Sequence, residues 1–199
     1  MKSLRVISAA VEGDIDEAVL QRLVVHVGGT VASVYGRKGK AHLRAKILGY
    51  NNTAKFSKWC VLADLDTDFK CAPNLVEEWL AVPAQFMCFR VAVHAIESWL
   101  LADAETIAAF LGVARSKLSF TDSDAFVDPK RAMVDFAGYS RRREIREDIV
   151  PRLGSGRRVG PAYTSRMIEY SKTVWRPDKA VSRSESLRRC IESLRRLTS

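Results

Sequence analysis

The sequence is poor in the residues that build the commonest metal and nucleotide sites. Its four cysteines form no CxxC pair, and its three histidines have no zinc-ligand spacing. It contains no glycine motif of the P-loop or dinucleotide-binding type. No apolar run approaches the length that crosses a bilayer. The sequence therefore gives no support to a zinc protein, a P-loop enzyme or a membrane-spanning protein.

The amino terminus, MKSLRVISAAVEGD, carries little that is typical of an export signal. A short apolar stretch follows a charge, but acidic residues come at once, and Glu12 stands where a small-residue cleavage site would lie. We interpret residues 4–13 as the first buried strand. Cys60 and Cys88 lie in apolar strand candidates and are predicted to be buried, reduced thiols. These features predict a cytoplasmic protein.

Positive charge is abundant and unevenly placed. The net charge is +9, yet residues 1–129 hold 14 Lys and Arg against 15 Asp and Glu. Residues 130–199 hold 18 against 8, so the whole excess lies in the last 70 residues. A basic segment of this kind suits a nucleic-acid partner, and equally a solvated basic surface or a face for an acidic protein.

Strand and helix patterns alternate in the first half of the chain. Continuous apolar runs predict four strands, at 4–13, 30–36, 59–66 and 86–93. Helical periodicity predicts intervening helices at 14–28, in the first part of 41–56, at 73–81 and, in one or two pieces, at 95–113. Asp14 is the expected N-cap of the first helix. This alternation predicts an α/β fold with a mostly parallel four-stranded sheet flanked by helices.

Strand patterns stop after about residue 113. The remaining segments with helical patterns are 128–140, 142–153, 162–175 and 182–197. We predict an α/β domain over residues 1–113 and a basic helical segment over residues 114–199, packed on the first domain. A helical layer on the sheet, without a domain boundary, is the alternative.

Acidic residues follow three of the predicted strands. Glu12 ends the first strand, Asp64 and Asp66 end the third, and Glu97 follows the fourth, while Asp16 lies four residues after Glu12. In parallel sheets, ligands collect beyond the carboxyl ends of the strands, so we expect these acids to converge. In the DxD, the alternation of side chains along a strand predicts that both carboxylates point the same way.

Clustered carboxylates repel one another unless a cation lies between them. Mg²⁺ or Mn²⁺ prefers oxygen ligands and binds through carboxylates and substrate phosphates, where it assists phosphoryl chemistry. Taken singly, each acid has a simpler explanation as a turn residue, a helix cap or a first-turn acid. The coincidence of three acidic strand ends favours a metal site.

The ordered segments VEGDID, LADLD and AIESWLLAD resemble the Toprim family. The chain is most similar to a small Toprim-like family that lies near the nucleases of the overcoming-lysogenization-defect group. The matching residues are Glu12, Gly13 and Asp16, the DxD at Asp64 and Asp66, Glu97 to Asp103, and an Asp-Pro-Lys at 128–130. The resemblance covers roughly residues 4–135, with a looser match near the carboxyl terminus.

The resemblance implies a function and a site. Glu12, Asp16, Asp64, Asp66 and Glu97 would hold one or two Mg²⁺ or Mn²⁺ ions. Glu12 or Lys130 would serve catalysis, with Lys130 at the scissile phosphate or assisting water. Asp16 departs from the more usual Glu and is shorter by a methylene, which puts a second metal in doubt. Related proteins imply a phage-defence role and an AAA-type ATPase partner.

Three basic clusters are candidates for contacts to nucleic-acid phosphates. They give salt-dependent binding without sequence preference, or else form a solvated surface. The residues concerned are Arg37, Lys38, Lys40, Arg141, Arg142, Arg143, Arg157 and Arg158.

Two functions compete on these grounds. The first is a divalent-metal-dependent nuclease or phosphoryl-transfer enzyme acting on DNA or RNA. The second is a non-catalytic Toprim-like subunit that docks an ATPase or nucleic acid. The sequence leaves open the choice between DNA and RNA, the number of metals and the oligomeric state.

Overall fold

The chain forms a four-stranded, all-parallel sheet flanked by helices in a computed structural model that describes residues 5–199. The strands are β1 (Val6–Val11), β2 (Thr30–Gly36), β3 (Trp59–Asp64) and β4 (Met87–Ala92), in the order β2-β1-β3-β4. The predicted α/β fold is therefore confirmed. Leu4, which begins the predicted strand 4–13, lies outside the described residues.

The described chain divides into two compact units. The sheet unit contains the residues up to Val93 together with Ser186–Ser199, and the helical unit contains His94–Glu185. The predicted division lay at residue 113. In the structure the helical unit begins directly after β4, and most of the last helix belongs to the sheet unit, although its sequence continues the basic helical segment.

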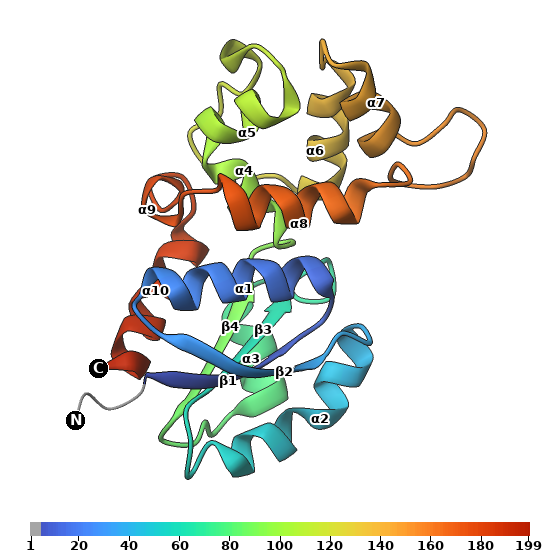
Figure 1. Cartoon of the computed structure of the whole chain (residues 1–199). Coiled ribbons are helices and arrows are strands. Elements are labelled where there is room, and N and C mark those ends of the chain that lie inside the picture. Colours follow the sequence, from blue (N-terminus) through green and yellow to red (C-terminus); the bar gives the residue numbers. More distant parts are fainter. Residues whose placement is uncertain (1–4) are drawn as a thin grey trace. The chain divides into compact units, whose positions relative to one another are not determined.

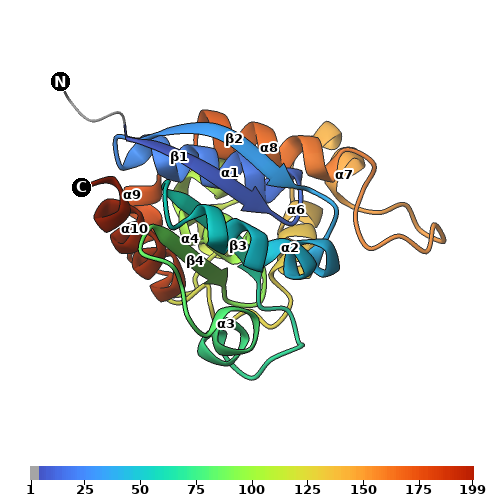
Figure 2. The same ribbon diagram turned by 90° about the horizontal axis from the view of Figure 1, so that it is seen from below.

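Helices cover both faces of the sheet within the sheet unit. Figures 1 and 2 show α1 (Asp14–His26) on one face, and α2 (Lys40–Thr53) and α3 (Ala72–Leu80) on the other. The last helix, α10 (Glu185–Thr198), buries Cys190, Ile191 and Leu194. Since β1 and β3 lie inside the sheet, they are almost wholly buried, as continuous apolar strands should be. The edge strand β2 is largely exposed.

The start of α1 differs from the prediction. Gly13, in extended conformation, occupies the N-cap position, and no side chain caps the helix there. Asp14 is instead the first helical residue and shares the first turn with Asp16 and Glu17. These acids stabilise the helix through its macrodipole rather than through a capping hydrogen bond.

The helical unit contains the helices predicted beyond β4, except the last one, and two short ones that were not predicted. The predicted helix at 95–113 is in two pieces, α4 and α5. The unpredicted ones are the 3₁₀ turn η1 and the four-residue α9. The bounds are α4 (Glu97–Ala102), α5 (Ala104–Leu111), η1 (Arg115–Lys117), α6 (Pro129–Gly138), α7 (Arg143–Ile149), α8 (Tyr163–Thr173) and α9 (Pro177–Ala180).

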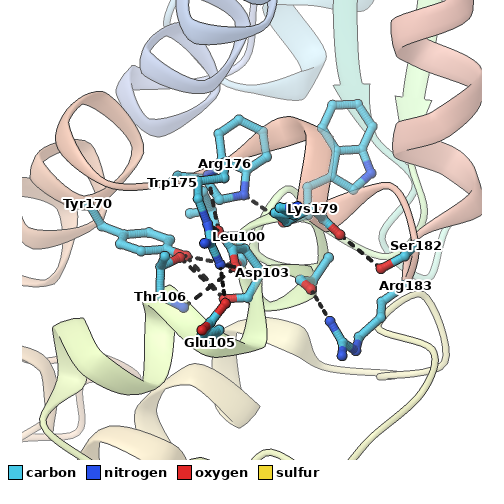
Figure 3. A network of polar contacts seen from close by, with 12 residues as sticks. Leu100, Asp103, Glu105, Thr106, Tyr170, Trp175, Arg176, Lys179, Ser182 and Arg183 are labelled. Carbon is cyan, nitrogen blue, oxygen red and sulfur yellow. Dashed lines mark hydrogen bonds and ion pairs between the residues drawn. The ribbon is translucent and has the colours of Figure 1, made fainter.

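Asp103 separates α4 from α5 and anchors a polar network in the helical unit (Figure 3). Its carboxylate accepts hydrogen bonds from Arg176 Nε at 2.9 Å, Arg176 Nη2 at 2.8 Å and the Arg176 backbone at 3.1 Å. Burial opposes ionisation of Asp103, but the bonds from Arg176 and Thr106 outweigh it and lower its pKa. The network explains the Asp at the end of the ESWLLAD segment as a structural residue.

Two further expectations concern burial and membranes. Cys60 and Cys88 are buried free thiols, as predicted, and Trp59 and Trp99 lie in the core. Within the described part of the chain, no helix has both the length and the apolar character needed to cross a bilayer.

Candidate functional site

Glu12 and Asp64 meet at the carboxyl edge of the sheet because β1 and β3 are neighbouring parallel strands. Glu12 directly follows β1, and Asp64 is the last residue of β3. The Oε1 atom of Glu12 accepts a hydrogen bond from the backbone N–H of Asp64 at 2.9 Å. Two residues that are 52 positions apart in the chain are thereby held together through the Asp64 backbone, and the predicted convergence of their carboxylates stays a prediction.

The carboxyl group of Glu12 ionises with difficulty. Burial raises its pKa from 4.5 to about 7, and the negative charges of Asp66 and Asp68 act in the same direction. The Asp64 backbone bond and the charge of Lys40 oppose this rise without cancelling it. A cation near Glu12 would favour the ionised form.

Lys40 lies at the centre of the negative charge that follows β3. Its Nζ lies 2.9 Å from Asp66 Oδ2 and 2.9 Å from Asp68 Oδ2, and donates to the carbonyl of Leu65 at 3.1 Å. Lys40 is the first residue of α2, which follows β2. Residues after two different strands thus form one cluster, and the Lys40 ammonium lies where a cation bridges two carboxylates.

Backbone geometry corrects the argument made for the DxD. Side chains alternate only while the strand continues, and β3 ends at Asp64. Asp66 has a left-handed φ of 52°, which is uncommon outside glycine. Its carboxylate reaches Lys40 by this turn and not by strand alternation.

The loop between β2 and α2 approaches β1 closely. The backbone N–H groups of Arg37 and Gly39 donate to the carbonyls of Val11 and Glu12, at 2.9 and 3.0 Å. Gly36 has a φ of 89°, and a Cβ atom there would lie 2.2 Å from the Val11 carbonyl oxygen. This position therefore requires glycine, and the contact brings Lys40 to the carboxyl edge.

Asp16 lies beside Gly13, the residue that follows Glu12, at the start of α1. It is only 7% exposed, and its Oδ2 atom lies 3.2 Å from the position of a Cβ atom added at Gly13. Its carboxylate therefore folds back over the residue that follows Glu12. A side chain at position 13 would crowd Asp16, which gives a physical reason for the Glu-Gly pair.

Glu97 and Lys130 form a second charged cluster, within the helical unit. Glu97 begins α4 and is 1% exposed. Its Oε1 atom accepts a hydrogen bond from the Tyr163 hydroxyl at 3.1 Å and lies 3.6 Å from Lys130 Nζ. Oε2 is buried and has no hydrogen-bond partner among the described residues. Burial, followed by the charge of Glu97, raises the pKa of Tyr163, so this hydroxyl remains a donor.

The Asp-Pro-Lys segment has a clear structural basis. Asp128 caps α6 by accepting from the backbone of Arg131 at 2.9 Å, and Pro129 occupies the first turn, where its missing N–H costs nothing. Asp128 also pairs with Arg158 at 2.5 Å. Because Asp128 caps α6, the helix begins at Pro129, and Lys130 in its first turn reaches Glu97.

The basic residues predicted to contact nucleic acid differ in whether their charge is paired with an acid. Lys38, Arg141 and Arg157 are exposed. The charges of four others are met by acids, in the pairs Arg37–Glu17, Lys40–Asp66, Arg143–Glu147 and Arg158–Asp128. Arg142 bonds to the Phe110 carbonyl and crowds Gly112. Nucleic-acid binding by these residues stays a prediction.

Carboxylate oxygens are the donors that Mg²⁺ and Mn²⁺ prefer. Among the described residues, no group of three or more His, Cys, Asp or Glu side chains is arranged to hold a metal ion. The donor chemistry of the sheet unit nevertheless fits such an ion. Glu12, Asp64, Asp66 and Asp68 supply only oxygens, and Lys40 already holds a positive charge between two of them.

Comparisons with known proteins do not add to this picture. No family model, no curated protein and no solved structure matches the chain. The resemblance to the Toprim family therefore stays a prediction from the quoted motifs, and the function has to be argued from the site.

The structure adds two residues to the candidate site. Asp68 is not among the metal ligands that the sequence predicts, yet its carboxylate shares Lys40 with Asp66. The D-x-D-x-D spacing of Asp64, Asp66 and Asp68 is the signal that points to it. Tyr163 donates to Glu97 across 66 residues of sequence, and no local pattern marks it.

The raised pKa of Glu12 predicts a pH-dependent stability in metal-free buffer. A carboxyl group with a raised pKa binds its proton more tightly in the folded chain than in the unfolded one. The stabilisation that the protonated Glu12 carboxyl gives to the fold is therefore complete below about pH 4.5 and is lost as the pH rises through 7. We expect the free energy of unfolding to fall by about 2–3 kcal/mol across this range relative to Glu12→Gln. Urea unfolding in EDTA at pH 5 and pH 8 measures this. Parallel pH profiles for the two proteins would refute it.

Proposed function

We propose that the chain is a divalent-metal-dependent nuclease that hydrolyses phosphodiester bonds. The observation that carries the proposal is the meeting of Glu12 and Asp64 at the carboxyl edge of a parallel sheet, beside Asp66, Asp68 and Lys40. This edge is where α/β proteins bind their ligands. The proposed ligands of the ion in the sheet unit are Glu12, Asp16, Asp64 and Asp66.

Each residue has a distinct part in the proposed reaction. A bound Mg²⁺ or Mn²⁺ ion would polarise the phosphoryl oxygen and activate water. Asp64 and Asp66 provide negative charge and oxygen donors. Without an ion, burial raises the pKa of Glu12 to about 7, and a bound cation would favour its ionised form, in which the carboxylate can accept a proton from water. The predictions that Glu97 is a further ligand and that Lys130 assists are tested by Glu97→Gln and Lys130→Met.

The test is cleavage of supercoiled plasmid DNA and of tRNA by the purified chain. We expect cleavage with Mg²⁺ or Mn²⁺, none in EDTA, and none from a variant carrying Asp64→Asn and Asp66→Asn. Glu77→Gln is the matched control, because Glu77 is an exposed acid on α3 of the same unit. If the wild-type chain cleaves neither substrate, alone or with a co-encoded AAA-type ATPase, the proposal fails.

A second candidate function is a non-catalytic subunit that docks nucleic acid or an ATPase. It is favoured by the position of Lys40, whose single positive charge offsets part of the negative charge of Asp66 and Asp68. On this account divalent ions do not bind, and nucleic-acid binding survives Asp64→Ala and Asp66→Ala.

Lys40→Met separates the two functions. If the carboxylates bind an ion, removing the competing ammonium should tighten Mn²⁺ binding about tenfold, since a close charge in a partly buried site contributes on the order of 1–2 kcal/mol. Calorimetric titration of both proteins measures the change. Unchanged or weaker Mn²⁺ binding in a folded Lys40→Met protein would favour the non-catalytic subunit, in which Lys40 is a structural cation.

A further inference from the structure

The sheet unit contains a hollow at the amino ends of β3 and β4, the end of the strands opposite to the carboxylates. Its volume is about 640 Å³, within the range of small-molecule sites. Lys58 immediately precedes β3, whereas Asp64 is its last residue. A six-residue strand is about 17–20 Å long, so the hollow is separate from the carboxyl edge.

Three cations line this hollow, namely Lys58, Arg90 and Arg196. Its described lining includes no aspartate or glutamate. Within residues 5–199, Lys58 and Arg90 form no ion pair, and Arg90 Nε is buried without a hydrogen-bond partner. Arg196 donates to the Ser193 hydroxyl at 2.8 Å, which is uncharged. Three positive side chains thus converge in a lining whose described side chains carry no negative charge.

This concentration of charge has a physical consequence. A half-buried guanidinium without a counter-ion loses hydration and gains nothing in return, so the arrangement favours an anion. The field of the arginines reaches a neighbouring thiol. The pKa of Cys88 is lowered by its hydrogen bond with Cys60 and, against the effect of burial, by the charges of Arg90 and Arg196. Arginine binds phosphate oxygens in pairs and is suited to this anion.

The remaining walls are apolar. They come from the end of α3, the start of β4 and the end of α10, and include Leu80, Pro83, Phe86, Met87 and Leu197. Phe86 and Met87 are only partly buried and present surface to the hollow. A ligand that satisfies both parts of the site has an anionic group and an apolar or aromatic body.

We propose that this hollow binds a small organic phosphate of mononucleotide size. Its phosphate lies among Arg90, Arg196 and Lys58, and its ring lies against Phe86 and Met87. The proposal does not depend on the nuclease activity, because it uses no residue of the carboxyl edge and needs no metal ion.

Calorimetry in EDTA tests the proposal with adenosine 5′-monophosphate as the probe. We expect micromolar binding, weaker binding of ribose 5-phosphate, which lacks the base, and none of adenosine, which lacks the phosphate. Inorganic phosphate should displace the nucleotide. Arg90→Met should weaken binding at least tenfold, and Arg195→Met, an exposed neighbour of Arg196 outside the hollow, should not change it.

Because Arg90 is partly buried, Arg196→Met and Lys58→Met are measured alongside it. Both remove exposed or half-exposed charges and should fold. The proposal is overturned if neither adenosine 5′-monophosphate nor ribose 5-phosphate binds at millimolar concentration, or if adenosine binds as well as the nucleotide. It is also overturned if those of the three variants that fold bind the nucleotide like the wild type. Since EDTA removes divalent ions, none of these results bears on the nuclease proposal.

Discussion

Glu12→Gln is expected to lower metal-dependent cleavage of nucleic acid by about a hundredfold or more, the usual loss when a general base or its equivalent is removed. Glutamine keeps a carbonyl oxygen that can accept the Asp64 backbone N–H, so the local hydrogen bond is preserved. It cannot take up a proton near pH 7 or supply a charged oxygen to an ion. Initial rates of plasmid nicking at saturating Mg²⁺ measure the effect.

The control for this variant is again Glu77→Gln, which changes an exposed acid of the sheet unit and should cleave like the wild type. A Glu12→Gln protein that folds and retains more than about a third of the wild-type rate would remove Glu12 from the reaction.

Asp103→Asn is expected to destabilise the helical unit by about 2–3 kcal/mol. Breaking a buried ion pair costs about 3–5 kcal/mol, and the Arg176 side chain is 34% exposed, which reduces the loss. Because ionised Asp103 is stabilised in the fold, its contribution is present above pH 4 and is lost as the pH falls through its lowered pKa. Urea unfolding at pH 7 and pH 3, followed by circular dichroism, measures both effects.

Glu105→Gln is the matched control, since Glu105 pairs with the same arginine but its side chain is 76% exposed. An exposed pair contributes little, so we expect a loss below about 0.5 kcal/mol. Equal losses in the two variants would show that the Asp103–Arg176 pair does not stabilise the fold as a buried pair.

The sheet could be predicted because its signals are local. Strands β1, β3 and β4 are buried on both faces and therefore appear as continuous apolar runs, and the helices between them follow from periodicity. Such patterns do not locate caps well. Asp14 has the residue type of an N-cap, but Gly13 takes that position because the extended chain leaving Glu12 turns there.

Long-range pairings limited the prediction of the site. The acids at the ends of β1 and β3 could be brought together from topology alone. Lys40 reads as part of a basic loop, and only the fold reveals that its ammonium lies between Asp66 and Asp68. The hydrogen bond from Tyr163 to Glu97 and the ion pair between Arg176 and Asp103 are likewise revealed only by the fold. A periodic sequence pattern does not show which distant residue lies beside a given charge.

The last helix shows the same limit. Its basic sequence continues that of the helical segment, which led to the prediction of one unit from residue 114 onwards. In the structure Ser186–Ser199 belongs to the sheet unit, where burial, followed by the neighbouring Cys88, raises the pKa of the Cys190 thiol. The hydrophobic residues on one face of α10 predict that this helix packs against another part of the chain, but they do not show which part.

Mn²⁺ titration of the purified chain by calorimetry is the most direct test of the claim that the carboxyl edge of the sheet holds a divalent ion. We predict saturable binding by the wild type, at least tenfold weaker binding by the protein with Asp64→Asn and Asp66→Asn, and wild-type binding by Glu77→Gln. Absence of binding by the wild type, or equal affinity in the double variant, would contradict the claim.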